Sequence, residues 1–298
     1  MILTSLKSGL QKTLGNKRMI AVFYLANLIF GLINILPLRA ILDGFVGYRF
    51  VGEKLAGRFD MDFLLELIAH EDSFLSAARG MILVIPVLYW IFLLFLSGGA
   101  FAVFASNENY SPAMFWGNCA RYFGRYLRLA LWSLPMLAIL LAAPLLTTGL
   151  QRLMFGKEPY QYIAYWGGWI RVGLGFIGIL IFAIIFDYAR IYTVRADERT
   201  MRVSLWQGFQ FALANFKYTF GLAALLFVIG GLVLAIYNPI ANLFAGPTVV
   251  VVALMFLTQQ FYMIVRMLLR LTLYAGQLNL YQNSAMAAYL EGTRGRCV

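Results

Sequence analysis

Four polar residues near the end of the chain follow a spacing that would place them on one face of a helix. They are Gln259, Arg266, Arg270 and Gln277. Because successive residues of an α-helix are rotated by about 100°, these side chains would form one stripe about 27 Å long. Such a stripe at membrane depth should face protein or water rather than lipid, and ionisable groups there indicate a functional site. The stripe is therefore the first candidate functional site.

An acidic residue that could meet this stripe lies earlier in the sequence. Asp187 and Arg190 have the spacing at which two side chains meet on the surface of a helix. Asp187 could equally reach Arg266 or Arg270. We therefore hypothesise a charged cluster of these four residues, which would contact a ligand or a partner. The alternatives are a cluster that only packs the helices, or arginines that extend to lipid headgroups.

A second group of chemically capable residues lies between residues 43 and 77. Asp62, Glu66 and the single histidine, His70, would share one face of a short amphipathic helix. A carboxylate and a histidine one turn apart can chelate a metal, but a zinc site usually has three protein ligands and oriented neighbours. The three residues are thus weak metal candidates, and a solvated acidic face is the simpler interpretation. We expect no resident metal.

The composition predicts an integral membrane protein. Of the 298 residues, 62% are hydrophobic and 12% are charged, whereas soluble domains carry about 25% charged residues. Six apolar stretches reach the length of about 20 residues that a helix needs to cross a bilayer. They lie near 19–41, 81–104, 129–150, 169–191, 218–237 and 248–272. The predicted fold is all-α, a single polytopic domain over 1–298 with six transmembrane helices.

The distribution of charge predicts the orientation of these helices. The flanks at the N-terminus, around 105–128 and 187–217, and after Arg266 carry the whole net charge of +11, whereas the other flanks have as many acidic as basic residues. The positive-inside rule places the first set in the cytoplasm. We therefore predict cytoplasmic termini, a cytoplasmic tail over 276–298 and an outer loop over 43–77. Basic residues at helix ends face anionic lipid, so we expect no nucleic-acid partner.

A short segment recurs in the basic flanks. Residues 5–19 and 204–218 share Ser, Leu, Gly, Gln, Leu and Asn at a constant offset, with a basic residue (Arg18 or Lys217) two positions after the Asn. Residues 114–128 match them in hydrophobicity. Each copy precedes a span that leaves the cytoplasm and has apolar residues on one helical face. We predict three repeat units, near 1–80, 105–170 and 195–275, each an amphipathic interfacial helix followed by a transmembrane hairpin. Chance resemblance between interfacial helices is the alternative.

The pattern SLxxGxQxxLxNxK within six spans resembles a broad class of bacterial six-helix inner-membrane proteins. The class includes the membrane domain of some glycerophosphodiester phosphodiesterases, and the segments at 187–190 and 197–199 are also similar to it. The resemblance implies a fold and a location in the bacterial cytoplasmic membrane, without an activity. The soluble phosphodiesterase domain has no counterpart in this chain.

These observations favour a non-enzymatic protein. The chain contains no G-x-S-x-G, P-loop or H-E-x-x-H motif, and we expect neither catalysis nor a cofactor. The favoured interpretation is an accessory or scaffold subunit that contacts lipids and other membrane subunits, or copies of itself. The alternative is a small transporter or lipid-handling permease that uses the charged cluster. A third interpretation is a membrane-embedded enzyme that uses the acidic outer loop. A scaffold predicts a packed bundle without a cavity; a transporter predicts a cavity at the stripe and unwound helix segments.

Overall fold

The computed structural model describes residues 1–46, 72–106, 110–156, 160–243 and 248–294. Within these ranges the chain forms eight α-helices and no strand. The helices are α1 (Ile2–Gly15), α2 (Lys17–Val46), α5 (Asp72–Ser106), α6 (Pro112–Phe155), α7 (Gln161–Arg195), α8 (Met201–Ala214), α9 (Phe216–Leu243) and α10 (Val249–Arg294). Most of the predicted outer loop, with Asp62, Glu66 and His70, lies outside the described residues.

Six of these helices are long and apolar enough to cross a membrane, which confirms the number of spans predicted from the sequence. They are α2, α5, α6, α7, α9 and α10. Helices α1 and α8 are short, and each precedes a long helix directly. The six apolar helices are those of a multi-pass membrane protein.

An asparagine marks each break between a short helix and the long helix that follows. The amides of Asn16 and Asn215 donate to the carbonyl oxygens of Lys12 and Phe211, one turn back, at 2.8 and 3.3 Å. Such local bonds compete with the helical ladder. The third copy of the repeated segment carries Arg125 at this position, and there α6 continues without a break. The expectation of a separate helix over 114–128 was therefore wrong.

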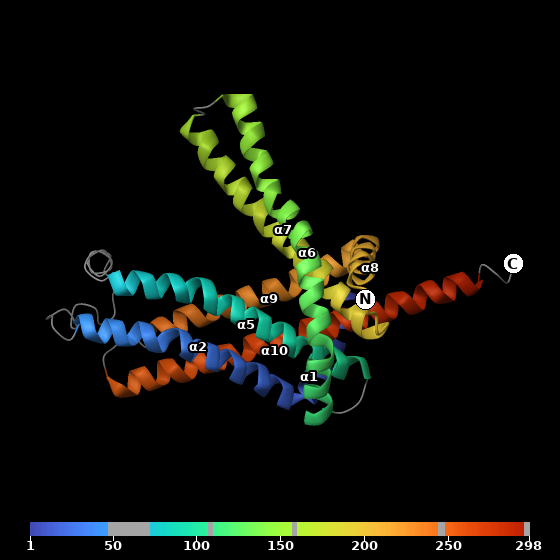
Figure 1. Cartoon of the computed structure of the whole chain (residues 1–298), viewed down its shortest axis with the longest axis horizontal. Helices are drawn as coiled ribbons and strands as arrows, with labels where there is room; N and C mark the ends of the chain where they lie inside the picture. The colour runs from blue at the N-terminus through green and yellow to red at the C-terminus, as the bar shows by residue number, and fades with distance from the viewer. Residues whose placement is uncertain (47–71, 107–109, 157–159, 244–247, 295–298) are drawn as a thin grey trace.

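The long helices do not form one parallel bundle. Figure 1 shows α2, α5, α9 and α10 running side by side, whereas the turn end of the α6–α7 hairpin rises away from them. The hairpin joins the bundle at its other end, where Gly99 of α5 packs closely against Cys119 and Phe115 of α6. The last turns of α7, from Ile184 to Ile191, are buried there. The two arms therefore meet at one end and diverge at the other.

The short helices pack on long helices where the two arms meet, α8 near the end of α7 and α1 on the middle of α10. Gly208 of α8 touches the backbone of Ala189 in α7, and Gly9 of α1 touches the backbone of Thr272 and Gly276 in α10. Ser5 of α1 also donates a hydrogen bond to Asn279 of α10 at 3.2 Å, in a stretch where Gln277, Leu278 and Leu280 are buried. The segment predicted as a tail from residue 276 is consequently helical as far as Arg294, because its first turns are part of the packed core.

Candidate functional site

A cavity of about 680 Å³ lies between α7, α9 and α10. Its wall combines a row of polar side chains with a larger apolar surface. The polar residues are Asp187, Tyr262, Arg266, Arg270 and Gln277, and the apolar ones include Leu180, Ile184, Leu226, Phe227, Leu234 and Leu273. Phe227 and Leu234 are also exposed on the outer surface. The cavity therefore reaches the surface between the helices, in a part of the molecule that the sequence predicts to lie within the bilayer.

The predicted pair of Asp187 and Arg190 forms, and it is buried. Arg190 donates to Asp187 Oδ1 through Nη2, and Gln277 Nε2 donates to Asp187 Oδ2 at 3.1 Å. Arg190 also donates to the Ser97 hydroxyl at 2.9 Å. A buried carboxylate must be paired and hydrogen-bonded, and these contacts meet that requirement for Asp187. The network joins α5, α7 and α10 and forms the polar end of the cavity wall.

Arg190 is enclosed by aromatic rings, a feature that the sequence did not indicate. Its guanidinium carbon lies 4.9 Å from the ring centre of Phe186, and 5.3, 5.4 and 5.9 Å from those of Phe101, Tyr274 and Tyr126. These are cation–π distances, and such contacts gain strength when water is excluded. The rings belong to α5, α6, α7 and α10. Arg190 therefore joins both arms of the molecule at the end where they meet.

The two arginines of the predicted stripe line the cavity but do not reach Asp187. Within the described residues, Arg266 and Arg270 make neither an ion pair nor a hydrogen bond. The predicted charged cluster therefore divides into a buried pair, Asp187 with Arg190, and two arginines without a partner among the described residues, Arg266 and Arg270. The Asp187 carboxylate is already occupied by Arg190 and Gln277, which explains the division.

Gln259, the first member of the stripe, is exposed and does not line the cavity. Its neighbour Gln260 instead accepts a hydrogen bond from the Tyr24 hydroxyl at 2.8 Å, which joins α10 to α2. The Asn27 amide group of α2 similarly accepts a hydrogen bond from Tyr89 of α5 at 3.0 Å. Such interhelical bonds hold membrane helices together. Of the predicted stripe, Gln259 is therefore outside the cavity, which ends near Tyr262.

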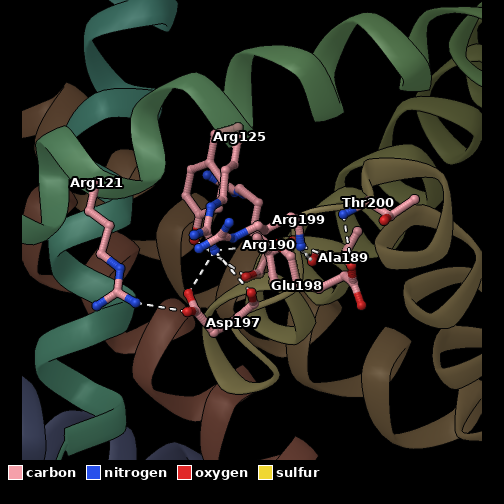
Figure 2. A network of polar contacts seen from close by, with 10 residues as sticks. Arg121, Arg125, Ala189, Arg190, Asp197, Glu198, Arg199 and Thr200 are labelled. Atoms are coloured by element: carbon pink, nitrogen blue, oxygen red, sulfur yellow. Dashed lines mark hydrogen bonds and ion pairs between the residues drawn. The ribbon is translucent and has the colours of Figure 1, made fainter.

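A second polar network fixes the turn between α7 and α8. Figure 2 shows Arg121 and Arg125 of α6 reaching Asp197, with nitrogen–oxygen distances of 2.8 and 2.6 Å. The hydrogen bond from Arg125 is the main cause that lowers the pKa of Asp197. Glu198 accepts bonds from the backbone N–H groups of Arg199 and Thr200, and these lower its pKa. The contribution of both carboxylates to stability is present above their usual pKa and is lost as the pH falls through the lowered values.

The turn network gives the segment at 197–199 a structural role. It holds α8 against α6 and α7 at the end where the arms meet and lies apart from the cavity. Comparisons of the chain with protein-family models, with curated proteins and with solved structures found no match in any of the three.

Proposed function

We propose that this chain is a lipid-handling membrane protein that binds an amphiphile between α7, α9 and α10. The observation that carries the proposal is the cavity of about 680 Å³, whose wall is apolar except for one polar row. Ligand pockets in proteins have volumes of about 300–1,000 Å³ and are mostly apolar with a few placed polar groups. A cavity that meets the surface at Phe227 and Leu234 can exchange its ligand with the surrounding lipid.

The continuity of the helices favours lipid binding over ion-coupled transport. Secondary transporters commonly hold their substrates at unwound helix segments near the membrane centre. Here α7, α9 and α10 are uninterrupted along the whole cavity. A site formed by continuous helices and open between them suits a ligand that arrives from the bilayer.

The predicted repeat and orientation belong to the same proposal. In each of the three units, the segment that matches the repeat packs on a returning helix: α1 on the middle of α10, the start of α6 near the end of α5, and α8 near the end of α7. The breaks at Asn16 and Asn215 also recur at equivalent positions. We propose three related units, with both termini in the cytoplasm of a bacterium and a location in its inner membrane. The likeness to the membrane domain of glycerophosphodiester phosphodiesterases remains part of this proposal.

Filling the cavity should remove the bound lipid. A Cβ atom added at Gly230 would meet no atom within 4 Å, and Gly230 lines the cavity. We expect Gly230→Phe to fold but to lose most of the lipid that the wild type retains through gentle-detergent purification, as measured by native mass spectrometry. Gly173→Phe is the matched control, because Gly173 has the same open space but does not line the cavity. Equal lipid retention by the two variants, or a wild type without bound lipid, would contradict the proposal.

A second candidate function is that of an accessory subunit, and the diverging hairpin favours it. Leu145, Leu146 and Leu153 of α6 are 70–84% exposed, in a hairpin whose turn end leaves the bundle. Other membrane helices could cover this surface, although lipid covers it equally well. We expect a stable complex after purification in gentle detergent if this candidate is correct. A clean monomer by light scattering would count heavily against it while leaving lipid binding in place.

A further inference from the structure

The polar row of the cavity has a fixed order along α10. Gln277 lies at the end where the arms meet, followed by Arg270, Arg266 and Tyr262 toward the other end. At 1.5 Å per residue, Arg270 is about 10 Å from Gln277 along the axis, and Arg266 is about 6 Å further. Leu180, Phe227 and Leu234 complete the wall with apolar surface. A ligand that fills the cavity must therefore be polar where it meets this row and apolar where it meets the rest of the wall.

The charges of Arg266 and Arg270 indicate that the ligand is an anion. A guanidinium group is always protonated and offers several N–H donors in a plane that matches phosphate and carboxylate oxygens. Neither Arg266 nor Arg270 has a partner among the described residues. Unpaired charges beside an apolar surface are costly. A phosphate group bound by both side chains would satisfy them.

The side-chain oxygen of Gln277 lacks a hydrogen-bond donor, which a ligand could supply. The Gln277 side chain is 1% exposed, and its Oε1 atom has no hydrogen-bond partner. A flip of the amide that exchanges Oε1 and Nε2 would not help, because Nε2 donates to the carboxylate of Asp187, and a carboxylate only accepts hydrogen bonds. A buried acceptor without a donor costs free energy. The ligand atom that meets Gln277 should therefore carry N–H or O–H.

We infer that the cavity binds a glycerophospholipid through its phosphate, held by Arg266 and Arg270, and selects headgroups that donate a hydrogen bond to Gln277. Phosphatidylethanolamine and phosphatidylglycerol have such donors, whereas the quaternary ammonium of phosphatidylcholine has none. The inference rests on the proposed function and specifies its ligand. The order of donor and phosphate in these lipids follows the order of Gln277 and the arginines along α10, and the acyl chains would meet the apolar lining from α7 and α9.

Competition between two lipids tests the headgroup. The full chain is purified in gentle detergent and incubated with equal amounts of phosphatidylethanolamine and phosphatidylcholine that have the same acyl chains, and bound lipid is counted by native mass spectrometry. We expect the wild type to prefer phosphatidylethanolamine roughly 10- to 100-fold, the value of one hydrogen bond that involves a charged group. Lipid bound without preference overturns the headgroup inference and leaves the proposed function standing. No bound lipid overturns both.

Three variants separate the contributions of the polar groups. Gln277→Met should abolish the preference while retaining lipid, and Gln259→Met, on the same helix but outside the cavity, should change nothing. The double variant Arg266→Gln with Arg270→Gln should bind both lipids roughly 10- to 100-fold more weakly, because charge-assisted bonds are lost. Retained binding in the double variant overturns the assignment of the phosphate. If Gln277→Met does not fold, the wild-type preference remains decisive.

A soluble headgroup distinguishes a lipid from a free phosphodiester. Glycerophosphoethanolamine carries the same phosphate and ammonium without acyl chains. We expect an excess of it to displace little bound lipid, because the apolar wall would be left uncovered. Complete displacement at concentrations comparable to the lipid would overturn the lipid as the ligand in favour of a soluble phosphodiester.

Discussion

Replacing Asp187 by leucine is expected to destabilise the protein by about 3–5 kcal/mol, the usual effect of removing one partner of a buried ion pair. Arg190 would keep its charge with only Ser97 and the surrounding rings as partners. Its Nε atom is buried and lacks a partner even in the wild type. The loss should appear as a lower free energy of unfolding, measured in detergent by a denaturant titration that is monitored by circular dichroism.

Two controls determine whether the effect comes from the buried pair. Asp43→Leu removes the acid of the Arg39–Asp43 pair, whose side chains are 70–75% exposed, so its effect should not exceed about 1 kcal/mol. The double variant Asp187→Leu with Arg190→Leu should recover most of the lost stability, because it leaves no unpaired charge. A double variant that is less stable than Asp187→Leu alone would mean that Arg190 stabilises the core through its rings more than Asp187 does through its charge.

The sequence contains the information for the helices because their signals are local. Apolar blocks of sufficient length predicted all six long helices. The pair of Asp187 and Arg190 followed from spacing within one helix. The continuous α6 could also have been predicted, since Arg125 replaces the asparagine that ends α1 and α8. Comparison of the three repeated segments is needed to recognise that the two asparagines mark helix ends.

The surroundings of the site depend on tertiary packing and could not be predicted in the same way. Four helices supply the rings around Arg190, and no spacing along one helix indicates which rings will meet. Helical periodicity placed Gln259 on the same face as Gln277, but it does not say where the cavity ends along that face. The divergence of the α6–α7 hairpin is likewise set by contacts between helices, since length and apolarity do not determine tilt.

Replacing Gly208 by alanine is expected to destabilise the protein by about 1–3 kcal/mol, although alanine is the better helix former. A Cβ atom at Gly208 would lie 2.5 Å from the nitrogen and 2.7 Å from the Cα of Ala189. Both are backbone atoms of a buried helix and cannot move aside alone. The variant must therefore displace α8 from α7, next to Arg190. Thermal unfolding in detergent measures the effect.

Gly124→Ala is the matched control, and its effect should have the opposite sign. Gly124 lies inside α6 with no atom within 4 Å of an added Cβ, so the change should stabilise by about 0.5–1 kcal/mol through lower backbone entropy in the unfolded chain. Gly9→Ala should behave like Gly208→Ala, since its Cβ would lie 2.7 Å from the Thr272 carbonyl oxygen. If all three variants raise the unfolding temperature, the short helices do not pack on α7 and α10 through glycine. If only Gly124→Ala raises it, close backbone contact holds both short helices in place on α7 and α10.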